Sequence, residues 1–211
     1  MDTTIGIIGA GSVGGALART LTRAGYRVRI GVRPGKDIDA LLQRCGDRAA
    51  AGTVREAFAA AEVTFLCVPA AAAVAVVRDA GDLRRKVIVD CTNPLRWDSG
   101  PVWAPPPEGS VAAALTAAVP EARVVKGFNT FGAEIHRNPS IGGAPAEVFL
   151  AGDDGIALER VGEVAARAGF APIVVGGLRN AALLEALAVL WIHLATAGGQ
   201  GREWAFRLAR R

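Results

Sequence analysis

A glycine-rich segment near the start of the chain has the spacing of a phosphate-binding turn. Gly9, Gly11 and Gly14 form a G-x-G-x-x-G pattern directly after the apolar run 4–8 and at the start of the amphipathic segment 12–24. Gly9 would permit a tight turn, Gly11 would let the backbone approach a pyrophosphate, and Gly14 would let helix and strand pack closely. The free N–H groups and the positive end of the helix dipole would then face the phosphates. In this context the pattern predicts a dinucleotide site rather than a turn without a ligand. The residues predicted to bind there are Gly9, Ala10, Gly11, Ser12, Val13 and Gly14.

The residues after the expected second strand predict which dinucleotide is bound. Proteins that bind NAD place an Asp or Glu about 20 residues after the glycine turn, where it accepts hydrogen bonds from the ribose 2′-hydroxyl. This chain has Arg33 at that place and no carboxylate between Asp2 and Asp37. A guanidinium can hold a 2′-phosphate through two charge-assisted hydrogen bonds. We therefore predict NADP(H) rather than NAD(H), with Arg33 as the main clamp, Lys36 as a second charge and Val32 beside them. A solvated surface arginine is the alternative.

Polar residues follow further apolar runs of strand length. Ligands of open α/β sheets bind beyond the carboxyl ends of the strands. We therefore expect these strand ends to hold nicotinamide, ribose or a second substrate, although each polar residue could instead begin an ordinary loop. Cys67 and Cys91, at two of these strand ends, are more typical of small core residues than of redox groups. The strand-end residues are Cys67, Val68 and Pro69, then Thr92, Asn93 and Pro94, then Asn129 and Thr130.

The chain offers little acid–base machinery for carbonyl chemistry. Tyr26 is the only tyrosine and Ile30 stands four positions later, so a Tyr-x-x-x-Lys pair is absent. We expect His136 in a loop and His193 packed within a helix, which leaves Lys126, at a strand end, as the lysine candidate. No catalytic side chain is therefore predicted. Such a nicotinamide site favours hydride transfer between two cofactors, which depends on the proximity and orientation of the two rings.

Apolar periodicity predicts an α/β protein with a Rossmann-type, doubly wound and mostly parallel sheet. Runs of strand length alternate with helical patterns, and continuous apolar runs are typical of parallel strands buried between two layers of helices. Thr53 and Glu56 have the spacing of a capping box at the start of one helix. The expected strands are 4–8, 28–32, 63–68, 87–90 and 123–127, and the expected helices are 12–24, 37–45, 53–61, 70–80 and 110–118.

The second half of the chain is less regular. Its expected elements are a proline-rich loop over 94–109, strands at 147–151 and 171–175 around a helix at 154–168, a long helix over 180–197 and a last short helix. Whether the last two strands extend the first sheet stays open. We predict an NADP-binding domain over 1–129. A smaller C-terminal α/β and helical lobe over 130–211 would carry the acceptor site and the dimer contacts.

Composition excludes several classes of protein. With 211 residues, 51% of them hydrophobic, and a net charge of +4, the chain can bury a core. Its basic residues form no aromatic-interleaved stripe of the kind that binds nucleic acid. Cys45, Cys67 and Cys91 fit neither a disulfide framework nor a zinc spacing. The uncharged run 63–77 is too short to cross a bilayer, and the acidic start is unlike a signal peptide. We expect a cytoplasmic protein without metal, membrane or nucleic-acid partners.

The sequence resembles the family of NADPH-dependent coenzyme F420 reductases, the F420:NADP oxidoreductases, and their uncharacterised relatives. The first of the matching segments is generic to dinucleotide folds and the later ones are specific. They are IIGAGSVG at 7–14, GVR at 31–33, DCTNPL at 90–95, VVKGFNT at 124–130, FLAGDD at 149–154, GLRNA at 177–181 and LWIHL at 190–194.

The resemblance implies direct hydride exchange between NADPH and a deazaflavin in a small homodimer. It implies that Leu178, Arg179 and Asn180, together with Asn129 and Thr130, border the deazaflavin. It also implies that the segment holding Arg33 recognises the 2′-phosphate. Two positions depart from the family pattern: Val32 stands where a hydroxyl residue is common, and Ala10 stands where some members have Thr.

These observations lead to one main hypothesis and one rival. The main hypothesis is an NADP(H)-dependent oxidoreductase whose acceptor is a deazaflavin such as F420 or a flavin. A 3-hydroxyacid-type dehydrogenase would need a large helical domain, for which the residues after Asn129 are too few. The rival is a non-catalytic NADP(H)-binding redox sensor, whose acceptor side would be closed by Trp191, Trp97 or Trp103.

Overall fold

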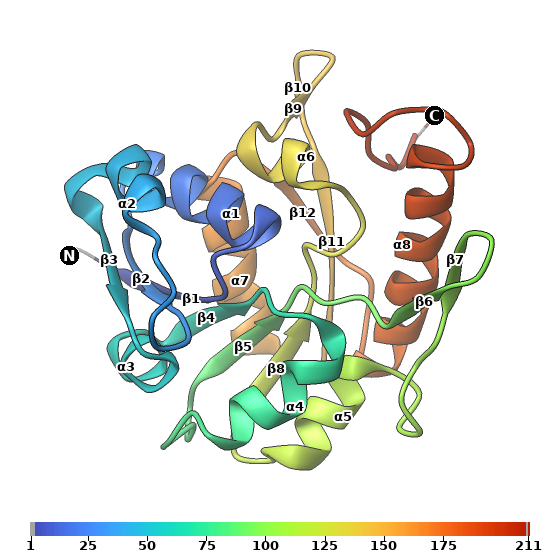
Figure 1. Ribbon diagram of the computed structural model, residues 1–211. Coiled ribbons are helices and arrows are strands. Elements are labelled where there is room, and N and C mark those ends of the chain that lie inside the picture. Colours follow the sequence, from blue (N-terminus) through green and yellow to red (C-terminus); the bar gives the residue numbers. More distant parts are fainter. Residues whose placement is uncertain (1–2, 210) are drawn as a thin grey trace.

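One eight-stranded sheet forms the centre of the molecule in the computed structural model, which describes residues 3–209 and 211 (Figure 1). The strand order is β12-β11-β8-β5-β4-β1-β2-β3. All neighbouring strands run parallel except β8 and β11, which are antiparallel. The predicted doubly wound, mostly parallel sheet is therefore confirmed. Its strands are β1 (Thr4–Ile8), β2 (Arg27–Gly31), β3 (Ala49–Gly52), β4 (Val63–Leu66), β5 (Val87–Asp90), β8 (Arg123–Lys126), β11 (Glu147–Gly152) and β12 (Ala171–Val174).

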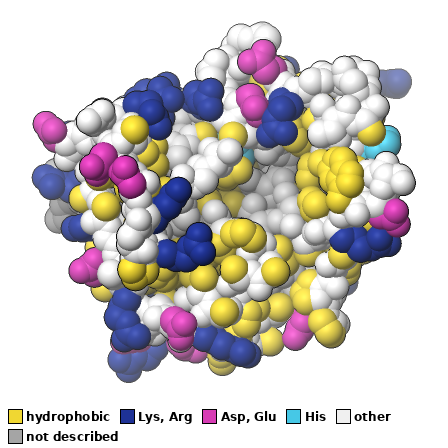
Figure 2. All heavy atoms as spheres, in the orientation of Figure 1, with side chains coloured by type: hydrophobic (Ala, Val, Ile, Leu, Met, Phe, Trp, Pro, Cys, Tyr) yellow, Lys and Arg dark blue, Asp and Glu magenta, His cyan; other side chains and the backbone are white. Residues whose placement is uncertain are grey.

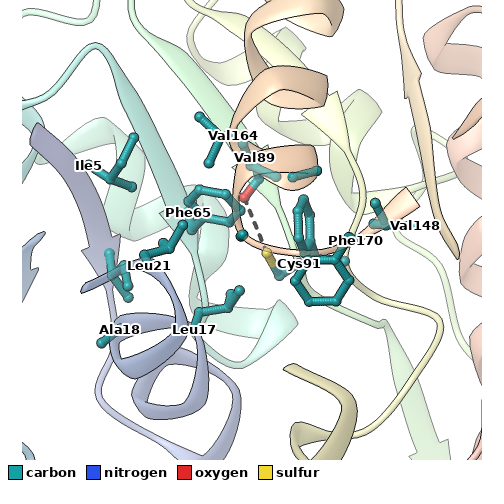
Figure 3. Close-up of a cluster of buried hydrophobic side chains, with 14 of the residues drawn as sticks. Ile5, Leu17, Ala18, Leu21, Phe65, Val89, Cys91, Val148, Val164 and Phe170 are labelled. Carbon is teal, nitrogen blue, oxygen red and sulfur yellow. Dashed lines mark hydrogen bonds between the residues drawn. The ribbon is translucent and has the colours of Figure 1, made fainter. Parts of the chain in front are cut away.

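Helices cover both faces of this sheet, which explains why its central strands are apolar on both sides. In β4, Phe65 packs into the core under α1 and α7, whereas Leu66 packs into the core under α3, α4 and α5. Figure 3 shows the first of these cores, with Phe65 and Phe170 on either side of Cys91, whose thiol donates to Val89 O at 3.7 Å. The rings of Phe65 and Phe170 each pack edge-on against Phe128, with centroids 5.1 and 5.3 Å from it. The helices are α1 (Ser12–Arg23), α2 (Asp39–Cys45), α3 (Val54–Ala60), α4 (Ala70–Arg78), α5 (Val111–Ala118), α6 (Ala133–Arg137), α7 (Gly155–Arg167) and α8 (Ala181–Ala195).

Local capping signals fix where several helices begin. The predicted capping box is present at α3, where Thr53 Oγ1 accepts from Glu56 N at 3.2 Å and Glu56 Oε2 accepts from Thr53 N at 2.8 Å. Ser110 caps α5 through Ala113 N, and Asp154 caps α7 through Ala157 N. Each cap satisfies an N–H group that the first turn of a helix leaves unpaired.

The segment 94–109 is not the continuous loop that its prolines suggest. It contains an antiparallel hairpin of β6 (Leu95–Trp97) and β7 (Pro101–Trp103). Pro101 is compatible with a strand because it stands at the first position of an isolated two-stranded sheet. Short elements that the sequence did not suggest are α6, β3, β9 (Ser140–Ile141) and β10 (Ala144–Pro145).

The predicted last helix is wrong, because the described residues after Gly201 are irregular. Tertiary contacts hold this segment in place of helical hydrogen bonds. Trp191 Nε1 donates to Trp204 O at 2.9 Å, and Leu208 N donates to Glu147 Oε2 at 2.7 Å. The ring of Trp204 also packs edge-on against Phe206, with centroids 5.3 Å apart.

The last two strands extend the first sheet, which answers the question that the sequence left open. β11 pairs with β8 and β12 pairs with β11, so the C-terminal strands share a sheet with the glycine turn. The division into 1–129 and 130–211 stays a prediction.

Helix α8, with the 3₁₀ turn before it, is unusually apolar. The segment Leu178–Ala195 has a mean hydropathy of 1.4, so its length and composition alone would allow it to span a membrane. This is weak evidence, because core helices meet the same criterion, and 39% of the segment is buried in this fold. Its inward face packs through Leu184, Ala188 and Trp191.

Helix α6 carries a buried histidine where the sequence suggested a loop. Both ring nitrogens of His136 lie 2.9 Å from backbone carbonyls, Nδ1 from Gly132 O and Nε2 from Phe128 O. Burial lowers the pKa of His136 from 6.5 to about 4, against the opposing effect of the two carbonyls. The imidazole is therefore neutral in the folded protein at pH 7.

This histidine predicts acid sensitivity of the fold. Above pH 6.5 the folded and unfolded states are both neutral at His136, so it contributes no pH dependence there. As the pH falls from 6.5 to 4, the unfolded state takes up a proton that the folded state does not, which lowers the free energy of unfolding by about 3 kcal/mol. Denaturant unfolding at several pH values measures this fall. In His136→Gln the component between pH 6.5 and 4 should disappear, and an unchanged pH profile in that variant would contradict the assignment.

Candidate functional site

The glycine turn has the geometry that a close approach to phosphate requires. A Cβ on Gly14 would lie 2.0 Å from Gly9 O, and a Cβ on Gly9, whose φ is +103°, would lie 2.4 Å from Cys67 O. Side chains are therefore excluded where the turn packs on α1 and β4. A Cβ on Gly11 would meet nothing within 4 Å, so this face of the turn is open. Gly11 caps α1 without a side-chain hydrogen bond, and the first turn of α1 carries no acidic residue. Its N–H groups are left available to an anion.

A cavity of about 400 Å³ lies directly beside this turn. Arg33 and Lys36 line it and are exposed, and none of the described residues that line it is acidic. Lys36 N donates to Arg33 O at 3.1 Å, which closes a four-residue turn that brings the two cations together. Val54, Ala72 and Val76 give the cavity apolar walls suited to a flat ring. The predicted cofactor residues that line it are Gly9, Ala10, Gly11, Val32, Arg33, Lys36, Cys67, Val68 and Pro69.

The other predicted cofactor residues lie close by. Ser12, Val13 and Gly14 form the first turn of α1. Asn93 and Pro94 line a neighbouring cavity of about 540 Å³ that shares Pro69 with the first. Thr92, which follows β5, is buried, and its Oγ1 has no hydrogen-bond partner among the described residues.

Two asparagines link the carboxyl ends of β5 and β8. Asn93 Nδ2 donates to Asn129 O at 2.8 Å, and Asn129 Nδ2 donates to Asn93 Oδ1 at 2.9 Å and to Leu184 O at 3.0 Å. Asn129 Oδ1 is buried without a partner. Buried polar atoms normally have partners, so unpaired ones at these strand ends mark a place where a ligand or water completes the structure. Thr130 is buried next to Asn129.

The backbone at Phe128 is strained, and nothing in the sequence indicates this. Its φ is +58°, a region that non-glycine residues rarely adopt. Phe128 is buried, and its carbonyl faces His136 Nε2. This conformation redirects the chain after β8 and sets the position of Asn129. Strain of this kind is costly and often lies at functional sites.

Lys126 lies in a buried network that the sequence did not suggest. Its ammonium donates to Asp90 Oδ2 at 2.9 Å, Thr92 O at 2.6 Å and Glu185 Oε1 at 3.0 Å, and the three charged side chains are fully buried. Glu185 Oε1 also accepts from Val111 N at 2.9 Å. The ammonium is thus occupied by three acceptors, and we assign it to positioning the strand ends against α8. The available sequence signal was that a charged residue ends each of two apolar strands, Asp90 in β5 and Lys126 in β8.

The predicted acceptor residues do not all come together within one chain. Asn129 follows β8, whereas Leu178, Arg179 and Asn180 follow β12, which with β11 runs opposite to the rest of the sheet. The turn Leu178–Asn180 therefore lies at the other edge of the sheet, where Leu178 N donates to Asp153 Oδ1 at 2.8 Å. It is Leu184, further along α8, that reaches Asn129. The reversed direction of β11 explains the separation.

The face above the strand ends is open. Figure 2 shows the surface hollowed between the side of the molecule that carries the glycine turn and the side formed by α8. Trp191 is buried, and Trp97 is 61% exposed. Trp97, Trp103 and Trp191 line neither the cavity at the glycine turn nor the one beside Asn93. A plugged acceptor side, which the sensor hypothesis requires, is therefore not observed.

Sheet order, glycine turn and basic cavity together define a dinucleotide-binding protein of the Rossmann type. Residues 4–94 match the family of coenzyme F420-dependent NADP oxidoreductases. The structure resembles that of a protein from Arthrobacter sp. FB24 to which F420-dependent NADP-reductase activity is ascribed, with a TM-score of 0.86, 28% identity and coverage of 98% of this chain and 99% of that one. A hypothetical protein from Sinorhizobium meliloti is 30% identical, with a TM-score of 0.74 and coverage of 83% and 86%. The match to this family thus covers the N-terminal part of the chain, and the likeness to the Arthrobacter structure covers nearly all of it.

A curated relative is similar over most of this chain. The metalloreductase STEAP3 of Rattus norvegicus is 29% identical over 184 residues, which are 87% of this chain. The chain spans 36% of the length of that relative.

Proposed function

We propose that the protein transfers a hydride between NADPH and a flavin or deazaflavin acceptor such as F420. In this proposal the 2′-phosphate binds at Arg33 and Lys36, the diphosphate binds at the glycine turn, and the nicotinamide lies at the strand ends beside Asn93. The observation that carries the proposal is the pairing of an acid-free basic cavity with an open face at the ends of β5 and β8.

The residues at these strand ends support positioning rather than proton transfer. The Asn93–Asn129 pair and the Lys126 network fix two neighbouring strand ends against α8, and Lys126 is committed to three acceptors. Hydride passage from the nicotinamide to an acceptor ring requires the two rings to be stacked, with no water between them. The proton that the reduced acceptor takes up would come from solvent through the open face.

Mixing the protein with NADPH and one acceptor at a time tests this function. We expect the absorbance of the reduced nicotinamide to fall when NADPH is mixed with F420, FMN or FAD. It should fall far more slowly when NADH replaces NADPH. Ferric chelates form a further arm, because the STEAP3 relative is a metalloreductase. Tight NADPH binding without oxidation by any acceptor would support the rival, a redox sensor.

We propose that a second copy of the chain covers the outer face of α8. Leu183 and Leu190, seven residues apart and so on one side of the helix, are 67% and 48% exposed. Val174 on the edge strand β12 is 56% exposed. Light scattering coupled to size-exclusion chromatography should give a dimer mass, and Leu183→Glu together with Leu190→Glu should give a monomer. A monomeric wild type would contradict this proposal.

A cytoplasmic location and the lack of nucleic-acid and membrane partners also stay predictions.

A further inference from the structure

Two cysteines face each other across the ends of β4 and β5, beside the glycine turn. Leu66 is opposite Asp90 in the register of these parallel strands, so Cys67 and Cys91 form the next pair along. The hydrogen bond from Cys91 N to Leu66 O, at 3.2 Å, continues the pairing to this point. Both side chains pack into the core under α1 and α7, and their thiols interact with each other.

The two thiols differ in their access to solvent. Cys67 is partly exposed and lines the cavity at the glycine turn together with Arg33 and Lys36. Partly exposed cysteines in electropositive surroundings are the ones that oxidants reach. Cys91 is buried in the core (Figure 3), and burial together with the neighbouring Cys67 raises the pKa of its thiol well above the ordinary value. Cys91 therefore stays protonated at pH 7, and Cys67 is the thiol that a small oxidant attacks first.

The spacing of the two strands suits a disulfide. Neighbouring strands lie about 4.8 Å apart, and a disulfide joins residues whose Cα atoms are about 4.4–6.8 Å apart and whose Cβ atoms are about 3.8 Å apart. Residues paired across the two strands meet the first condition. Cβ atoms that follow the strand spacing must approach by about 1 Å to meet the second.

The end of β5 is anchored and does not supply this movement. The residues on both sides of Cys91 are held by the ammonium of Lys126, which donates to Asp90 Oδ2 at 2.9 Å and to Thr92 O at 2.6 Å. Thr92 N also donates to Asp90 Oδ1 at 2.9 Å. Closing the disulfide therefore moves Cys67 toward Cys91.

A movement of Cys67 reaches the glycine turn, because the two are packed in direct contact. A Cβ on Gly14 would lie 3.3 Å from Cys67 Cβ, and a Cβ on Gly9 would lie 2.4 Å from Cys67 O. Cys67 N also donates to Ile8 O at 2.8 Å, immediately before the turn. The N–H groups that face the diphosphate would thus be displaced with Cys67.

We propose that Cys67 and Cys91 form a reversible disulfide when hydrogen peroxide oxidises Cys67, and that this disulfide weakens dinucleotide binding. The formation of the disulfide does not depend on the proposed function, whereas its effect on binding rests on it.

The oxidation proceeds in two steps. The Cys67 sulfur attacks one oxygen of the peroxide, so that an S–O bond forms, the O–O bond breaks and the leaving hydroxide takes the thiol proton as water. The Cys91 sulfur then attacks the Cys67 sulfur, so that the S–S bond forms and the hydroxyl group leaves with the Cys91 proton as a second water. Fixed proximity favours this second step despite the burial of Cys91. Two thiols and one peroxide thus give one disulfide and two waters.

Peptide mapping by mass spectrometry after exposure to hydrogen peroxide tests the disulfide. Wild type, blocked with N-ethylmaleimide and digested without reductant, should give two peptides linked through Cys67 and Cys91, which dithiothreitol separates. Cys45 is the matched control and should stay a free thiol, because it is as buried as Cys91, at 8% exposure, but lies on α2. In Cys91→Ala, dimedone should trap a sulfenic acid on Cys67. Absence of the linked peptides in wild type, or linkage through Cys45 or between two chains in their place, would overturn the proposal.

Titration of tryptophan fluorescence with NADP⁺ before and after oxidation tests the consequence for binding. Oxidised wild type should bind roughly tenfold or more weakly, and dithiothreitol should restore the affinity. Peroxide should leave the Kd of Cys67→Ala where it was before treatment, whereas Cys45→Ala should respond as wild type does. Equal Kd values for oxidised and reduced wild type would overturn the effect on binding and leave the disulfide intact. If reduced wild type binds no NADP⁺, the proposed function fails and the effect on binding fails with it, whereas peptide mapping still decides the disulfide.

Discussion

Replacing Lys126 with methionine is expected to lower the free energy of unfolding by about 3–5 kcal/mol. The ammonium is fully buried and bonded to Asp90, Glu185 and the carbonyl of Thr92. Methionine of similar length would leave two carboxylates in an apolar interior without a cation. Breaking a buried ion pair on one side is strongly destabilising for this reason. Urea unfolding at pH 7, extrapolated linearly to water, measures the change.

A charge-balanced variant separates the electrostatic effect from lost packing. Asp90→Asn/Lys126→Met/Glu185→Gln removes the charges together and should recover a large part of the stability that Lys126→Met loses. Lys36→Met serves as the control, since Lys36 is exposed and should change stability by less than about 0.5 kcal/mol. Stability of Lys126→Met within about 1 kcal/mol of wild type would show that the network does not hold a charged lysine.

Replacing Arg33 with alanine is expected to abolish the preference for NADPH over NADH. The guanidinium borders the cavity at the glycine turn, whose lining holds no carboxylate among the residues that the structure describes. Its contacts with a 2′-phosphate would be worth about 1.5–3 kcal/mol, which corresponds to roughly a 10- to 150-fold rise in Kd for NADPH. The Kd for NADH should stay unchanged, because NADH lacks that phosphate. Titration of tryptophan fluorescence with each dinucleotide measures both values.

Two further variants sharpen this test. Lys36→Ala should weaken NADPH binding by a smaller factor, because a single ammonium makes no bidentate contact. Arg84→Ala should leave both affinities unchanged, since its guanidinium is exposed and paired with Asp82. Equal affinity of the wild type for NADPH and NADH would refute the role of Arg33.

The N-terminal half of the site could be predicted from sequence because its signals are local. Gly9, Gly11 and Gly14 act through the backbone conformation of one turn, and Arg33 follows the next strand at a fixed place in a βαβ unit. Caps such as Thr53 and Ser110 likewise involve residues three positions apart. Alternating apolar runs then determine that the sheet is parallel and covered on both faces.

Only the tertiary structure decided how distant segments meet. The apolar run of β11 predicts a strand but not its direction, and its antiparallel pairing with β8 carries Leu178–Asn180 to the edge opposite Asn129. Lys126 forms its ion pair with Glu185 only because α8 crosses the strand ends. Phe128, with its positive φ, packs against the rings of Phe65 and Phe170 from two other strand-end segments. Contacts between residues far apart in the chain depend on strand order and on the total packing of the core, which no local pattern encodes.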